Sequence, residues 1–367
     1  MNFIPISEPS ITQKEIDYVT DAIKSGWVSS LGKYINMFEE RFAKYCDTKY
    51  AVATSNGTTA LHLALVSLGV KAGDEVIIPD FTFVATASAV NYIGAKVVTV
   101  DIDEDTLCID PQAIEKAITS KTKAIIPVHL YGHPANMEEI NKIANKYNLF
   151  VVEDAAEAHG SEVDCKRVGG LSDAGVFSFY GNKIITSGEG GMITTNNEKL
   201  YQKMRYLRDH AMSEDKRYWH TEVGFNYRMT NLQASLGVAQ FERINELLLK
   251  KKEIFEWYQY KLKDIENIKL NFQKENCKNV YWMICVEIIG FTEKQRDALL
   301  VNLKEKGIDG RPFFYPVSDM PMYNKADTPI AHKIYQRGFN LPSYFDMIKE
   351  QIEYIAKELK KVIFNVI

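Results

Sequence analysis

The chain has 367 residues, 46% of them hydrophobic and 25% charged, which indicates a globular protein with a sizeable core and two domains. Its net charge of −4 and sequence pI of about 6.0 argue against a nucleic-acid-binding protein, which would carry an excess of basic residues. The N-terminus lacks a signal-peptide pattern, no apolar run is long enough to span a membrane, and the five cysteines are scattered. These features predict a cytoplasmic protein with reduced thiols, no nucleic-acid or membrane partner and no metal site.

The N-terminal part of the chain predicts one helix followed by alternating strands and helices. Thr12 and Glu15 form a capping-box pattern at the start of a helix that ends near Gly26. The expected strands are 50–54, 75–78, 96–100, 124–128, 150–153 and 175–179, and the expected helices are 58–68, 85–93 and 137–147. This alternation predicts an α/β fold in which helices cover both faces of a largely parallel sheet. Ligands in such folds bind beyond the carboxyl ends of the strands.

The C-terminal part predicts a second, smaller α/β domain. A long helical stretch from about Thr230 to Leu262 leads into it, and Lys250–Lys252 on this stretch are expected on a solvated face. The elements expected after it are a strand at 281–288 and helices at 292–306 and 347–362. We expect the large domain to comprise residues 1–245 and the small domain residues 246–367.

Three strand ends carry residues suited to chemistry, and the first is SNGTTAL, residues 55–61. This segment follows a strand and opens directly into a helix. A glycine and hydroxyl groups at a helix N-terminus predict a phosphate or other anion site, because free backbone N–H groups and the helix dipole both favour negative charge. The alternative is that Ser55 or Thr58 only caps the helix.

The second strand end is FVVED, which closes with Asp154 and is followed by AAEAHG. A buried carboxylate needs a partner, and the candidates are a metal ion, an arginine or a protonated ring nitrogen. His129 and His159 are candidate metal ligands beside it, but no spacing signature supports a metal site. The structural alternative is that Asp154 caps a neighbouring loop.

The third strand end is the segment VFSFYGNKIITSGEGGMITT, residues 176–195. It places Lys183 in a turn between two β-runs and ahead of the glycines at 188, 190 and 191. Burial in such a loop lowers the pKa of a lysine and suits it to Schiff-base chemistry. The alternative is that Lys183 binds phosphate as a point charge. From the residues alone, the chain is an α/β enzyme with an anion site, a strand-end acid and a candidate reactive lysine.

At these residues the chain resembles the DegT/DnrJ/StrS family of sugar aminotransferases, which have the aspartate-aminotransferase-like fold (fold type I). The resemblance covers nearly the whole chain, through the segments PISEPSITQKE, SNGTTALHLAL, EVIIPDFTFVAT, PVHLYGHPANM, VVEDAAEAHGS, FSFYGNK, GEGGMITT, GFNYRMTNLQASLGVAQ and RPFFYPV. Within the family, FSFYGNKIITSGEGGM, NYRMTN and RPFFYPV are most similar to the GDP-perosamine synthases. The resemblance implies a large domain with a mixed, mostly parallel sheet, a smaller C-terminal α/β domain, pyridoxal 5′-phosphate (PLP) as cofactor, and a homodimer with shared active sites.

The resemblance also implies a role for each matching residue. Lys183 matches the lysine that binds the cofactor as a Schiff base and moves the proton between substrate carbon and cofactor, and Asp154 matches the aspartate that keeps the pyridine nitrogen protonated. The other expected cofactor contacts are Phe83 on the ring face, Gly57, Thr58 and Ser178 at the phosphate, Glu157 at the ring hydroxyl, and Asn226 from the neighbouring subunit. Arg228 and Arg311 are the expected substrate contacts.

The implied reaction transfers an amino group from L-glutamate to a nucleotide-linked keto sugar in polysaccharide biosynthesis, such as that of an O-antigen or a capsule. GDP-4-keto-6-deoxymannose is the leading acceptor, and a UDP- or dTDP-linked keto sugar or a small phosphorylated ketone are the alternatives. Sugar dehydratases of this family have histidine in place of the lysine, so Lys183 argues against that reaction. A non-catalytic sensor is disfavoured because both Lys183 and Asp154 are present.

One position departs from the perosamine synthases that the chain resembles. Those relatives carry a bulky apolar residue where this chain has His159. We interpret His159 as a packed core histidine, and the alternative is that its side chain alters the site and the choice of substrate.

Overall fold

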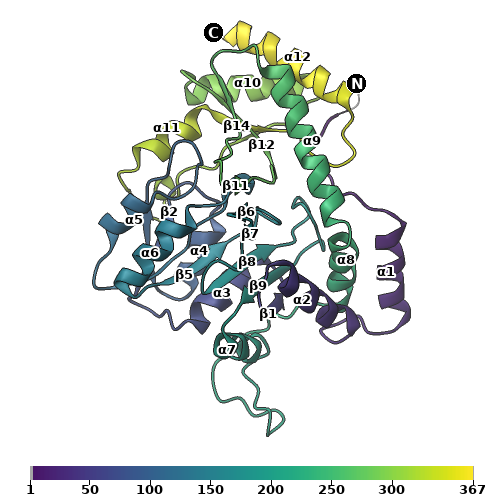
Figure 1. Ribbon diagram of the computed structural model, residues 1–367, viewed down its shortest axis with the longest axis vertical. Coiled ribbons are helices and arrows are strands. Elements are labelled where there is room, and N and C mark those ends of the chain that lie inside the picture. Colours follow the sequence, from purple (N-terminus) through teal and green to yellow (C-terminus); the bar gives the residue numbers. More distant parts are fainter. Residues whose placement is uncertain (1–2, 367) are drawn as a thin grey trace.

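The structure is a computed structural model that describes residues 3–366, with side chains up to residue 363. It has a large part built on a seven-stranded sheet and a smaller part built on a four-stranded sheet, and α9 (Ile244–Leu262) connects them (Figure 1). The predicted division between residues 245 and 246 lies in the first turn of α9 and stays a prediction.

The sheet of the large part has the strand order β1-β9-β8-β5-β4-β2-β3. The strands are β1 Tyr50–Thr54, β2 Glu75–Pro79, β3 Lys96–Val100, β4 Thr122–Ile125, β5 Phe150–Asp154, β8 Ala174–Ser178 and β9 Gly191–Thr195. Strand β9 is antiparallel to both of its neighbours, whereas β8, β5, β4, β2 and β3 run parallel to one another. The carboxyl ends of the parallel strands therefore meet at one edge of the sheet.

Helices cover both faces of this sheet. One face packs against α2 (Lys33–Tyr45), α5 (Pro111–Ala117), α6 (Met137–Tyr147) and α8 (Asn231–Phe241), and α1 (Gln13–Lys24) packs beside α8. The other face packs against α3 (Gly57–Ser67), α4 (Ala85–Tyr92) and α7 (Glu198–Arg208). Successive residues of β5 serve the two cores in turn, Val151 the first and Val152 the second. This explains why the strands read as continuous apolar runs, and it confirms the predicted α/β fold.

The smaller part has an antiparallel sheet of order β10-β12-β14-β13. Its strands are β10 Ile268–Leu270, β12 Ile284–Ile288, β13 Arg311–Pro312 and β14 Gly338–Leu341, and its helices are α9, α10 Glu293–Glu305, α11 Pro329–Arg337 and α12 Lys349–Val366. Ile4 from the start of the chain belongs to the same core and pairs with Ile308. A short third sheet joins the two parts through β11 Cys277–Lys278, β6 Glu162–Val163 and β7 Lys166–Arg167.

The predicted elements of the large part are confirmed, with small shifts at their ends. Thr12 and Glu15 form the predicted capping box at the start of α1. The strand expected at 124–128 instead ends at Ile125, and Val128 makes only an isolated bridge to Asp154. The helix after β1 is capped by Asn56, whose side chain accepts the N–H of Thr59, so the capping alternative named the wrong residues.

Two expectations for the stretch 230–262 are wrong. The chain forms two helices there, because α8 ends at Phe241 and α9 begins only at Ile244. Arg243 lies at this break, where it donates hydrogen bonds to Glu15 and to the backbone of Ser10. The lysine triplet is not uniformly solvated either, since Lys251 is buried and hydrogen-bonded while Lys252 is exposed.

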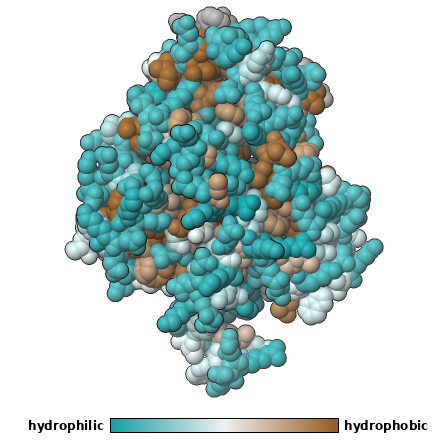
Figure 2. Space-filling view, in the orientation of Figure 1, coloured by the Kyte–Doolittle hydropathy of each residue, from teal (hydrophilic) through white to brown (hydrophobic). Residues whose placement is uncertain are grey.

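No helix within residues 3–366 is long and apolar enough to cross a membrane. On the face shown in Figure 2, hydrophobic residues lie in separate areas between hydrophilic ones.

Candidate active site

A cavity of about 610 Å³ lies beside the carboxyl ends of the parallel strands. It lies between the two parts of the chain, because its lining combines residues that follow β2, β5 and β8 with Trp282 and Phe314 from the smaller part. Seven of the eight expected cofactor-contact residues line it. The seven are Gly57, Thr58, Phe83, Asp154, Glu157, Ser178 and Lys183.

One end of the cavity is an anion-binding arrangement at the N-terminus of α3. Asn56 uses its side chain to cap Thr59 and leaves the N–H groups of Gly57 and Thr58 free of hydrogen bonds to any residue from 3 to 366. The hydroxyl of Ser178 comes from the end of β8 and lines the same space. A Cβ on Gly57 would lie 2.9 Å from the Cβ of Ser178, so the close approach of α3 to β8 requires glycine.

Asp154 ends β5 and presents a buried carboxylate to the middle of the cavity. Its Oδ2 accepts the hydroxyl of Thr86 at 2.8 Å and its Oδ1 accepts the N–H of Ala156 at 3.2 Å. Burial raises the pKa of Asp154, and the hydrogen bond from Thr86 opposes that shift. Within the described residues Asp154 is in no ion pair with an arginine and in no group of metal ligands, and a proton-bearing ring nitrogen is a partner that fits its carboxylate.

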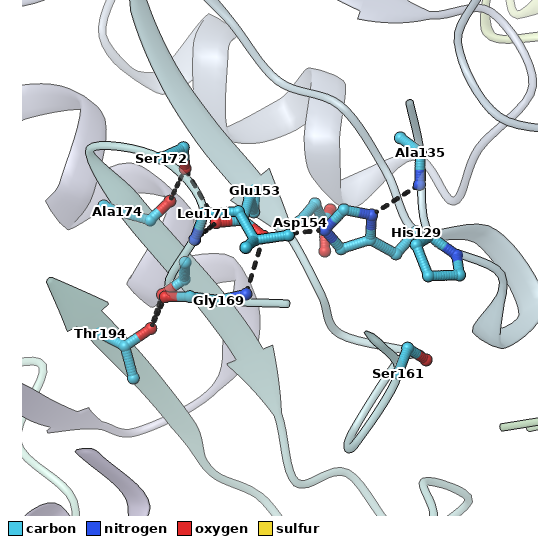
Figure 3. Close-up of polar contacts among 12 residues, drawn as sticks. His129, Ala135, Glu153, Asp154, Ser161, Gly169, Leu171, Ser172, Ala174 and Thr194 are labelled. Atoms are coloured by element: carbon cyan, nitrogen blue, oxygen red, sulfur yellow. Dashed lines mark hydrogen bonds and ion pairs between the residues drawn. The ribbon is translucent and has the colours of Figure 1, made fainter. Parts of the chain in front are cut away.

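Glu153, the residue before Asp154, points to the other side of the sheet (Figure 3). Its carboxylate accepts hydrogen bonds from the ring of His129 at 3.1 Å, from the N–H groups of Gly169 and Leu171, and from the hydroxyl of Ser172. The other ring nitrogen of His129 accepts the N–H of Ala135 at 3.0 Å. Both nitrogens of His129 are therefore engaged, and His129 has no free lone pair for a metal ion.

Lys183 and Glu157 form a buried pair at the wall of the cavity. The Lys183 Nζ lies 3.7 Å from Glu157 Oε1 and 4.1 Å from the centre of the Trp282 ring. Burial lowers the pKa of Lys183, and the nearby carboxylates of Glu157 and Asp154 oppose this shift. Burial raises the pKa of Glu157 to about 7, with Lys183 opposing, and its Oε2 accepts the N–H of Tyr131 at 2.8 Å.

Aromatic side chains close one side of the cavity. Phe83 is 55% exposed and its ring centre lies 5.8 Å from that of Phe314. Tyr131 packs nearly parallel to Phe314, with 5.5 Å between ring centres and 13° between planes. The exposed face of Phe83 is thus available to stack on a planar ring inside the cavity.

The remaining expected contacts lie outside this cavity. Asn226 is exposed, and its side-chain oxygen accepts hydrogen bonds from Arg228. Arg228 also pairs with Asp209 at 2.7 Å. Arg311 is exposed on β13 and pairs with Asp309 at 3.2 Å. One chain alone therefore does not bring Asn226, Arg228 and Arg311 together with Lys183.

His159 is completely buried, as the packed interpretation expected. Its ring lies 5.5 Å from the ring of Phe177 and 5.6 Å from that of Phe179, centre to centre. Burial lowers the pKa of His159 to about 3, which keeps the imidazole neutral. His159 does not line the cavity and lies in the core behind the site.

The residues present fit PLP by the chemistry that they offer. The free N–H groups of Gly57 and Thr58 and the hydroxyl of Ser178 can bind a phosphate group. The buried carboxylate of Asp154 can pair with a protonated pyridine nitrogen. The buried amine of Lys183, whose pKa is lowered, can form a Schiff base with the aldehyde carbon of PLP. The cavity of about 610 Å³ also leaves room for a substrate beside a ring of this size.

Several lining residues were not predicted from the sequence. Thr86 lies one helical turn after Phe83, in the same TFVAT segment, so its role could have been predicted from that motif. Trp282 gave no such signal, because it reaches the site only through long-range packing, and Tyr131, which packs against the Trp282 ring, is not itself part of the lining.

The chain matches the model of the DegT/DnrJ/EryC1/StrS aminotransferase family over residues 9–360. It is 43% identical to a GDP-perosamine synthase of Escherichia coli O157:H7, over 98% of this chain and 99% of that protein, and 43% identical to one of Caulobacter vibrioides, over 98% of each. Among solved structures, a Streptococcus pneumoniae protein described as a candidate sugar aminotransferase, in its PLP form, aligns over 100% of both chains with 29% identity and a TM-score of 0.95.

Proposed function

The chain belongs to the DegT/DnrJ/EryC1/StrS aminotransferase family and is a PLP-dependent aminotransferase, and on this basis we propose that it transfers an amino group from L-glutamate to a GDP-linked keto sugar. The observation that carries the proposal is the 43% identity to two GDP-perosamine synthases over 98% of this chain. The proposed acceptor is GDP-4-keto-6-deoxymannose, and the proposed product is GDP-perosamine.

In this proposal different residues of the cavity bind different parts of the cofactor. The N–H groups of Gly57 and Thr58 and the hydroxyl of Ser178 would hold the phosphate, Phe83 would cover the ring, and Glu157 would face the ring hydroxyl. When bound, PLP supplies an electron sink for the negative charge left on a substrate carbon that loses its proton.

Two side chains carry the proton chemistry. The amine of Lys183 removes and returns the proton at the substrate carbon, and the burial that lowers its pKa increases the neutral fraction able to accept a proton. The carboxylate of Asp154 holds a proton on the ring nitrogen, and Thr86 fixes the direction of that carboxylate. Phe314, against which Tyr131 packs, excludes water from one side of the cavity.

We propose that the boundary at residues 245/246 divides the site between two domains. Lys183, Asp154 and the anion-binding end then belong to the large domain, while Trp282 and Phe314 belong to the small one. A change in the relative position of the domains would open or close the cavity around the substrate.

We also propose that the active unit is a homodimer in which Asn226 completes the neighbouring site. Asn226 is exposed and absent from the lining of its own cavity, which supports a contact across subunits. The adjacent loop exposes Trp27 and Leu31, with 57% and 64% of their surfaces accessible, and Asn231 fastens this loop to the start of α8. Large apolar side chains gathered there suit an interface with a second copy of the chain.

Mixing two inactive variants is expected to restore activity if the sites are shared. In a hybrid of Lys183→Ala and Asn226→Ala subunits, one of the two sites keeps both Lys183 and Asn226, so random mixing should restore about a quarter of the native activity. The measurement is turnover before and after the subunits are allowed to exchange. A fully active monomer in sedimentation, or an Asn226→Ala enzyme of native activity, would contradict the shared site.

The nucleotide of the acceptor is expected to contribute to catalysis through remote binding. Its diphosphate carries charge that Arg228 or Arg311 can pair, and that binding orients the keto carbon at the cofactor. Removing the nucleotide should therefore reduce kcat/KM, by a factor of about 10 for each ~1.4 kcal/mol of lost transition-state binding.

Steady-state kinetics with four acceptors test this expectation: GDP-4-keto-6-deoxymannose, its UDP and dTDP counterparts, and dihydroxyacetone phosphate, each with L-glutamate as donor. We expect the highest kcat/KM with the GDP sugar. A clear preference for the UDP or dTDP sugar would show that the acceptor carries that nucleotide and not GDP. A clear preference for the small ketone would refute a sugar-nucleotide acceptor, although the aminotransferase reaction would still hold.

A further inference from the structure

We propose that Trp282, held in place by the buried Lys251, is a positioning residue that orients the amine of Lys183 and favours its protonated form. The inference rests on the role proposed above for Lys183. It goes further by assigning a function to an indole and a lysine of the smaller part of the chain.

The indole of Trp282 is attached to the segment that carries Lys183. Its Nε1–H donates a 2.8 Å hydrogen bond to the carbonyl of Asn182, the residue before Lys183, and its ring centre lies 4.1 Å from the Lys183 Nζ. Trp282 is only 4% exposed and packs at 16° to the ring of Tyr131. The ring and the amine therefore keep a fixed relation, because one hydrogen bond and one stacking contact restrain the indole.

Lys251 holds the backbone from which this indole projects. Its Nζ lies at the end of a buried side chain of α9 and donates hydrogen bonds to the carbonyl of Trp282 at 2.9 Å, to the hydroxyl of Ser343 at 3.0 Å and to the carbonyl of Ser343. Burial lowers the pKa of Lys251 to about 7, and in its protonated form the amine has three donors, all of which these three acceptors use. Trp282 precedes β12 and Ser343 follows β14, so Lys251 ties together adjacent ends of two paired strands.

The face of an aromatic ring attracts a cation, and tryptophan does so most strongly. The titratable groups that face the Lys183 amine are Glu157 and Asp154, with His159 on the core side, and burial acts against the charged amine. An amine that accepts a proton and returns it must be stable in both forms. The Trp282 ring stabilises the protonated form without adding a further negative charge next to Asp154 and Glu157.

The test is the pKa of Lys183, measured on the full-length chain freed of cofactor. Trace acetylation with acetic anhydride across a range of pH, followed by mass spectrometry of the Lys183 peptide, reports this pKa without any assay of activity. In Trp282→Leu we expect the pKa of Lys183 to fall by roughly 0.5 to 1 unit, and in Trp282→Phe by less, because phenylalanine keeps a weaker aromatic face.

The direction of the shift separates this role from a purely structural one. If the indole only excluded water, its loss would hydrate the amine and raise the pKa of Lys183. A raised or unchanged pKa in Trp282→Leu therefore overturns the proposal. Trp282→Phe keeps an aromatic ring in the core and gives an answer even if the leucine variant folds poorly.

Lys251→Met should lower the pKa of Lys183 as Trp282→Phe does, because it releases the carbonyl of Trp282. The matched control is Lys252→Met on the same helix, whose exposed side chain should leave the pKa unchanged. If Lys183 is not the lysine that binds the cofactor, a different experiment shows it. Borohydride reduction would then fix the cofactor to a lysine other than Lys183, whatever the pKa of Lys183 proves to be.

Discussion

Replacing Lys183 by alanine is expected to reduce turnover by roughly 10⁴-fold or more, because the site then has no amine to bind the cofactor covalently or to move the substrate proton. The cofactor should still bind without a covalent link, since the free N–H groups of Gly57 and Thr58 and the carboxylate of Asp154 are unchanged. The measurements are steady-state kinetics and the cofactor content of the purified variant.

Lys252→Ala is a suitable control, since that lysine is exposed on α9 and should be replaceable without loss of activity. In the native enzyme, borohydride reduction followed by peptide mapping should place the cofactor on Lys183. A label on another lysine, or an alanine variant with near-native turnover, would show that the assignment is wrong.

Asp154→Asn is expected to reduce turnover by about 10³-fold or more, which corresponds to a barrier higher by ~4 kcal/mol. The neutral amide no longer holds a proton on the ring nitrogen, so the ring accepts less of the charge that develops on the substrate carbon. The fold should be retained, because asparagine has nearly the same shape and its amide can donate to the hydroxyl of Thr86, which now donates to Asp154.

The measurements for Asp154→Asn are kcat, thermal unfolding and the absorbance of the bound cofactor as a function of pH. We expect the protonation of the bound ring to shift to lower pH while the unfolding temperature changes little. A variant with native turnover would show that Asp154 has only a structural role. Thr86→Val tests the orientation of the carboxylate and should have a smaller effect than Asp154→Asn.

The elements that a local pattern determines could be predicted from the sequence. The strands β1, β2, β3, β5 and β8 and the capping box at Thr12 follow from local sequence patterns, and they form where they were expected to within one residue. The anion-binding end was also predictable, although Asn56 and not Ser55 or Thr58 caps α3. The break at Arg243 was not, because it depends on partners near residues 10 and 15, more than 220 positions away in the chain.

The contacts that the small domain makes with the site could not be predicted from the local sequence, for the same reason. Trp282 bonds to the backbone of Asn182, 100 positions earlier, and Lys251 bonds to Ser343, 92 positions later. In the sequence Lys251 is one of three consecutive lysines, and only the packing of α9 against the sheet distinguishes it from its neighbours. Resemblance to a family supplied Lys183 and Asp154, but it did not supply these supporting contacts.

The two adjacent carboxylates of β5 fix the register of this strand in the sheet. Glu153 is surrounded by four hydrogen-bond donors on one side of the sheet, and Asp154 faces the cavity on the other (Figure 3). A slip of β5 by one residue would exchange the two faces, leaving those donors without their acceptor and turning apolar neighbours toward the wrong core. The alignment of β5 is thus locked from both sides, so the acid of the site stays in place for as long as the sheet itself is correctly paired.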